Sequence, residues 1–168
     1  VSTESWPEPR VLEQIGAALD ASARPALVIG AAVDRGNAWE EVLRLAERHN
    51  TRVWPAPMSG RCGFPEDHRL FAGFLPAMRE GIVRLLAGHD VIFAVGAPVF
   101  TYHVEGAGPH VPGGAALYQL IDDPTIAAWA PTGTSARALD ATMAERAATT
   151  KATRIISSPR QGSLLSKP

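Results

Sequence analysis

The sequence lacks the features that mark several common classes of protein. Its 168 residues include one cysteine, Cys62, which excludes an internal disulfide and a metal site with several cysteine ligands. No apolar run approaches the roughly 20 residues that a membrane-spanning helix needs. The opening segment, VSTESWPEPR, has neither the basic start nor the apolar stretch of a secretory signal. We therefore expect a cytoplasmic protein in which Cys62 is a structural thiol.

An excess of charge of one sign is also missing. The 16 Lys and Arg residues nearly balance the 17 Asp and Glu residues, which leaves a formal net charge of −1. Such a balance gives no electrostatic reason to expect a nucleic acid or an anionic membrane as a partner. The chain has the length of one ordinary domain with a buried core. The composition therefore indicates a globular protein with neither of these partners.

Short strands that alternate with helices are predicted by the pattern of apolar residues. Nearly continuous apolar runs, typical of parallel strands covered on both faces, predict strands at 26–29, within 51–57, at 91–97 and at 115–121. Weaker strands are expected at 70–71 and 136–139. Apolar residues at helical spacing predict helices over 9–19, over 38–49, after Pro76, around 125–129 and over 140–148. This alternation predicts an α/β fold, a three-layer doubly wound parallel sheet of about six strands.

Helix faces, helix ends and domain limits are also predicted. The inner face of the helix over 38–49 should carry Trp39, Val42, Leu43 and Ala46. The inner face of the helix after Pro76 should carry Met78, Ile82, Leu85 and Leu86. Asp34 and Asn37 are candidates to cap the start of the former helix, and Gly88 to cap the end of the latter. Residues 1–148 would form the domain, and residues 149–168 a linker or interface tail.

Ligands bind beyond the carboxyl ends of the strands in an open parallel sheet, and three loops qualify here. The loop after Ile29, GAAVDRGNA, has Gly30 but lacks the other glycines of a dinucleotide-binding fingerprint. We expect an ordinary turn there and no bound NAD or FAD. The next loop contains Ser59, Cys62, Glu66, Asp67 and His68. Its three consecutive ionisable residues cannot easily converge on one ion, so we expect a surface loop without a metal or catalytic role.

The loop after the strand at 91–97, GAPVFTYHVEGAGPHVPGG, is the most informative segment. A loop of this length in a compact domain is usually functional or disordered. Phe100 and Tyr102 are apolar, aromatic neighbours of His103, and an imidazole can exchange a proton near neutral pH. From these residues alone, His103 is either an acid–base group or a structural histidine. Nothing near His110 in the sequence suggests a role for it.

Four segments carry a resemblance to a known family. They are PALVIGAAVD, LAERHNTRVWPAPMSGRCGFPEDHRLFAGFLPA, LLAGHDVIFAVGAPVFTYH and LIDDPTIAAWAPTG, and they cover most of residues 25–148. In order and spacing they resemble the central domain of thiamine-diphosphate-dependent enzymes, most closely that of the benzoylformate decarboxylases. The resemblance implies a Rossmann-like domain of a 2-oxo acid decarboxylase that converts benzoylformate to benzaldehyde and carbon dioxide.

The same resemblance implies partners and a site. Thiamine diphosphate and Mg²⁺ would lie between an N-terminal pyrimidine-binding domain and a C-terminal diphosphate-binding domain, in a homo-oligomer such as a tetramer. This chain would bind no cofactor or metal itself, and on its own it would be inactive. Its segment Phe100-Thr101-Tyr102-His103 matches the family's FxYH segment. The match implies that His103 is catalytic, through proton transfer, and that Phe100 and Tyr102 lie close to the substrate.

Two other functions stay open at this point. The chain could be a free-standing nucleotide- or FAD-binding module of the same fold, or a relative that serves as an interaction or regulatory unit. Bound flavin or adenine nucleotide would favour the module, and capture of a partner would favour the interaction unit.

Overall fold

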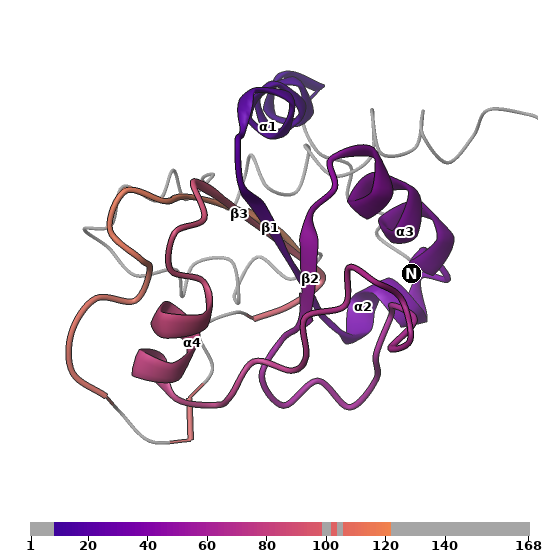
Figure 1. The fold of residues 1–168 in the computed structure, drawn as a ribbon. Helices are drawn as coiled ribbons and strands as arrows, with labels where there is room; N and C mark the ends of the chain where they lie inside the picture. Colours follow the sequence, from indigo (N-terminus) through magenta and orange to yellow (C-terminus); the bar gives the residue numbers. More distant parts are fainter. Residues whose placement is uncertain (1–8, 99–101, 104–105, 122–168) are drawn as a thin grey trace, which may run out of the picture.

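A computed structural model describes residues 9–98, 102–103 and 106–121, which form a parallel sheet with helices on both faces (Figure 1). The elements, in chain order, are α1 (Pro9–Ala21), β1 (Pro25–Ile29), α2 (Ala31–Arg35), α3 (Trp39–Arg48), β2 (Arg52–Pro55), α4 (Arg79–Leu85), β3 (Val91–Val95) and β4 (Ala116–Leu120). The predicted elements at 125–129, 136–139 and 140–148 and the predicted tail lie outside the described residues.

The described part of the sheet has four strands in the order β2-β1-β3-β4, and every pair is parallel. The register places Ile29 beside Pro55 and Val95, and Val95 beside Leu120. The carboxyl ends of all four strands therefore meet at one edge, and the loops that follow β1, β2 and β3 start there. The predicted parallel α/β fold is confirmed. The predicted strand at 70–71 is a single parallel bridge to β2.

Two apolar layers hold the sheet between its helices, because successive side chains of a strand point to opposite faces. On one face Leu27 and Phe93 pack against α1, α2 and α3, and on the other face Val28 and Ile92 pack against α4. Figure 1 accordingly shows α3 and α4 on opposite sides of the sheet. Each large aliphatic side chain that is fully buried contributes about 1.5–3 kcal/mol. The first four residues of β3 are buried, as expected for a parallel strand covered on both faces.

Helix faces and ends differ from the predictions at several residues. Trp39 is 41% exposed, because the buried positions of α3 begin only with Val42. Neither predicted residue caps α3: Ala38 is its N-cap, Asn37 has a φ of 53°, and Asp34 lies in α2, a short helix that the sequence pattern did not predict.

The helix after Pro76 also differs. It begins at Arg79, and two of its four predicted inward residues, Met78 and Leu85, are exposed. Its C-cap is Leu86, and Gly88 lies in the turn that follows with a φ of 80°. The helix is shorter than predicted, so only Ile82 and Leu86 reach the core.

Asp90 links the start of β3 to the turn between α1 and β1. Its carboxylate accepts hydrogen bonds from the Ser22 hydroxyl and from the backbone amides of Ala23 (2.8 Å) and Arg24 (3.1 Å). Burial by itself would raise the pKa of Asp90, but these hydrogen bonds outweigh it and lower the pKa to about 2. Asp90 is therefore ionised at neutral pH and fixes the edge of the sheet opposite the loops.

Candidate functional site

The carboxyl ends of β1 and β3 form the topological switch point of this sheet, where doubly wound folds bind ligands. Backbone fills this crevice. The Gly30 amide donates to the Val95 carbonyl (2.8 Å), and the Ala32 amide donates to the Gly96 carbonyl (3.3 Å). A Cβ placed on Gly30 would lie 2.1 Å from the Gly96 oxygen. The turn after β1 and the turn after β3 are therefore in direct backbone contact at the switch point.

His103 lies in the loop that leaves β3, and it is exposed. Its backbone amide donates to the carbonyl of Ala77, which precedes α4, at 3.1 Å. This hydrogen bond ties the loop to a helix on one face of the sheet while the residue stays open to solvent. The exposure agrees with a residue that serves a neighbouring part of a larger protein, and a catalytic role for His103 stays a prediction.

Tyr102 is half-buried beside His103. Its hydroxyl lies 3.1 Å from Nδ1 of His110, and the guanidinium carbon of Arg79 lies 5.4 Å from the centre of its ring. Burial raises the pKa of the Tyr102 hydroxyl, and the positive charge of Arg79 opposes this effect. A role for His110 could not be predicted from the sequence, because Tyr102 lies eight residues away in an irregular loop. Phe100 lies outside the described residues.

The same loop contacts the first turn of α4 again after His103. Glu80 accepts a hydrogen bond from the backbone amide of Ala107 at 2.7 Å, and Nη1 of Arg79 donates to the Gly108 carbonyl at 3.3 Å. The pKa of Glu80 is lowered by its own backbone amide and by that of Ala107. Glu80 is therefore ionised at neutral pH, and the loop lies against α4 on both sides of His103.

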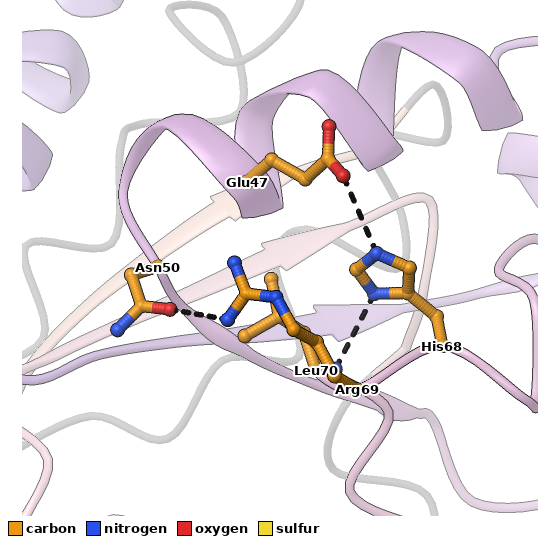
Figure 2. Close-up of polar contacts among 5 residues, drawn as sticks. All are labelled: Glu47, Asn50, His68, Arg69 and Leu70. Carbon is orange, nitrogen blue, oxygen red and sulfur yellow. Dashed lines mark hydrogen bonds and ion pairs between the residues drawn. The ribbon is translucent and has the colours of Figure 1, made fainter.

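The loop between β2 and α4 makes local contacts (Figure 2). The His68 imidazole lies between a carboxylate oxygen of Glu47 on α3 (3.4 Å) and the backbone amide of Leu70, which donates to its Nδ1 (3.3 Å). Arg69 donates to the side chain of Asn50 at 2.8 Å. These contacts hold the loop against the end of α3. His68 thus links the loop to α3 and to its own backbone at Leu70.

Other candidate residues of this loop are also spread over its surface. The Ser59 hydroxyl donates to the Arg61 carbonyl (2.7 Å), and Arg61 forms an ion pair with Asp34 (2.7 Å). Glu66 and Asp67 are exposed. Across the described ranges, no three His, Cys, Asp or Glu side chains come together in a way that could hold a metal ion. These polar side chains lie at the surface while Phe64 and Leu70 of the same loop are buried in the core, and the lack of a metal or catalytic role stays a prediction.

Cys62 is half-buried, and its thiol donates to the Phe64 carbonyl at 3.1 Å. Burial raises the pKa of this thiol, an interaction with the Phe64 backbone opposes this effect, and the charge of Glu66 raises the pKa further. The net shift is upward, so the thiol is protonated at neutral pH and fits the structural role expected from the sequence.

No helix within the described segments is long and apolar enough to cross a membrane.

Comparisons of this chain with a family model and with a curated protein agree on one family. The family model described as "Thiamine pyrophosphate enzyme, central domain" matches residues 12–125. A curated benzoylformate decarboxylase of Pseudomonas aeruginosa is 47% identical over 133 residues, which are 79% of this chain and 25% of that protein.

Solved structures agree with this match. The thiamine diphosphate-dependent 4-hydroxybenzoylformate decarboxylase of Rhodococcus jostii RHA1 superposes with a TM-score of 0.73 at 38% identity, over 85% of this chain and 27% of that one. The benzoylformate decarboxylase of Polynucleobacter necessarius superposes with a TM-score of 0.73 at 39% identity, over 76% of this chain and 24% of that one. The chain thus spans about a quarter of the length of these relatives.

Proposed function

The chain belongs to the thiamine pyrophosphate enzymes, as their central domain, and we propose that the protein containing it decarboxylates an aromatic 2-oxo acid such as benzoylformate. Benzoylformate decarboxylases are what this chain resembles, at 47% identity in the curated relative. The names of two related structures, one acting on benzoylformate and one on its 4-hydroxy form, support a substrate with an aromatic ring.

The observation that carries the proposal within this chain is the placement of His103. It lies in the loop beyond the carboxyl end of β3, is exposed, and is fixed through its backbone amide to Ala77. An imidazole so placed can take or give a proton at a site formed with a neighbouring domain. We also propose that Tyr102 and Phe100, in the same loop, lie close to the substrate.

Thiamine diphosphate, when bound, would supply the electron sink that decarboxylation of a 2-oxo acid needs. The residues described here do not fit that cofactor, because the turns at Gly30 and Gly96 are in direct backbone contact and no cluster of metal ligands forms among the described residues. We therefore propose that the rest of the protein, an N-terminal pyrimidine-binding domain and a C-terminal diphosphate-binding domain, holds the cofactor with Mg²⁺. A homo-oligomer, such as a tetramer, and a cytoplasmic location complete the proposal.

A free-standing module for nucleotide or FAD is not favoured. The Gly30 amide donates to Val95, the last residue of β3, and the Ala32 amide donates to Gly96 in the turn that follows, so neither amide at the start of α2 is left to bind a phosphate. The similarity to decarboxylases points the same way.

The test is to purify the full-length protein and assay it with thiamine diphosphate, Mg²⁺ and a panel of 2-oxo acids. We expect release of benzaldehyde from benzoylformate, with a kcat/KM at least about 100-fold above that for pyruvate, since a pocket built for an aromatic ring discriminates strongly against a methyl group. A protein that prefers pyruvate, or that decarboxylates neither acid, would overturn the assignment of substrate.

A further inference from the structure

The start of α4 fits closely against the loop that carries His103. The backbone on one side of the loop is fixed by the hydrogen bond from His103 to Ala77. On the other side, Glu80 accepts a hydrogen bond from Ala107, and a Cβ placed on Gly106 would lie 2.5 Å from either carboxylate oxygen of Glu80. The loop backbone therefore passes directly over the carboxylate, at a position that only glycine can occupy without a shift.

Glu80 differs from the other residues that hold this loop. Arg79 packs over the half-buried Tyr102, so its removal would also disturb packed groups. The Glu80 side chain, in contrast, is exposed and belongs to neither apolar layer. A hydrogen bond from an amide to a carboxylate is stronger than a bond between neutral groups. Removal of this carboxylate should therefore loosen the loop and leave the folded domain intact.

We propose that Glu80 is a positioning residue, which holds the loop around His103 in the geometry needed for proton transfer. Its carboxylate acts on Ala107, four residues after His103, and the Ala77 carbonyl acts on His103 itself. The two contacts limit how far the imidazole can move from its place. The inference rests on the proposed role of His103 and assigns the residue that keeps His103 in place.

The first test is a double-mutant cycle in the full-length protein, assayed for benzoylformate decarboxylation. Glu80→Ala should lower kcat by about threefold to tenfold, the range expected for loss of one charge-assisted hydrogen bond at an exposed site. In a His103→Ala background the same substitution should change kcat by less than about twofold, because residues that act through one another are not additive. A merely structural role for Glu80 would give equal losses in both backgrounds.

A second readout does not depend on activity. Amide hydrogen exchange of peptides that span residues 102–108 should be about tenfold faster in Glu80→Ala than in the wild type, without cofactor or substrate, since local opening controls exchange. Glu80→Gln keeps an oxygen that can accept from Ala107, so it should restore most of the protection and of kcat. Glu13→Gln, an equal change of charge at an exposed position on α1, is the matched control and should match the wild type.

The outcomes separate the two claims. If His103→Ala leaves turnover unchanged, the proposed function of His103 fails, and faster exchange in Glu80→Ala would still show that Glu80 holds the loop. If His103→Ala lowers turnover but Glu80→Ala matches the wild type in both exchange and kcat, the positioning role of Glu80 is refuted on its own.

Discussion

Gly30→Ala tests the close approach of the two turns at the switch point. The new Cβ would lie 2.1 Å from the Gly96 oxygen and 2.6 Å from both Cα and Cβ of Ala97. The backbone of Gly30 has a φ of −116°, which any residue adopts, so the entire cost is steric. Added methyl groups in packed sites cost about 1–3 kcal/mol. Because backbone atoms cannot rotate away, we expect about 3 kcal/mol, at the upper end of that range.

Urea unfolding of this chain, followed by circular dichroism, would measure the change. Gly16→Ala is the matched control: it makes the same substitution inside α1, where a Cβ would meet no atom of the described residues within 4 Å apart from its own chain neighbours and helix backbone. The control should stabilise the chain by up to about 1 kcal/mol, because alanine favours a helix more than glycine does. If the free energy of unfolding of Gly30→Ala lies within about 0.5 kcal/mol of the wild-type value, the two turns do not pack as closely as the 2.1 Å approach to the Gly96 oxygen requires.

Three further predictions follow from other parts of the chain. Asp90→Asn should destabilise the chain by about 1 kcal/mol at pH 7, a value reduced for solvent screening. Because the pKa of Asp90 in the folded chain is lowered from 3.8 to about 2, the urea midpoints of wild type and variant should converge as the pH falls from about 4 to about 2. A difference that stays constant over this pH range would contradict the prediction. Cys62, whose pKa is raised by burial, should react with a disulfide reagent at pH 7 at least about tenfold more slowly than a free thiol; faster reaction would mean that a thiolate is present. Calorimetric titration of this chain with thiamine diphosphate and Mg²⁺ should show no binding, and stoichiometric micromolar binding would place the cofactor site here.

The strands could be predicted from the sequence because each is a short apolar run, and such runs reflect burial on both faces. Val91–Val95 is the clearest case, and the structure places it between β1 and β4. Helix ends were predicted less well. Trp39 fits an apolar stripe but lies at the first residue of α3, and the pattern does not show where along a helix the contact with the sheet begins.

The candidate site was less accessible to prediction than the fold. His103 could be singled out from its loop and from the resemblance, and its catalytic role stays a prediction. The contacts of Glu80 with Ala107, and of Tyr102 with His110, could not be foreseen. Each depends on how an irregular loop folds back onto a helix, and no periodicity in the sequence encodes such a return.

The measurement that tests the central claim most directly compares His103→Ala in two settings. In this chain alone, thermal unfolding should shift the free energy of unfolding by less than about 0.5 kcal/mol, because the side chain is exposed. In the full-length protein, turnover of benzoylformate should fall by about 10²–10⁴-fold, the usual range for a positioned proton-transfer group. A large loss of stability with nearly normal turnover would make His103 a structural histidine and contradict the account.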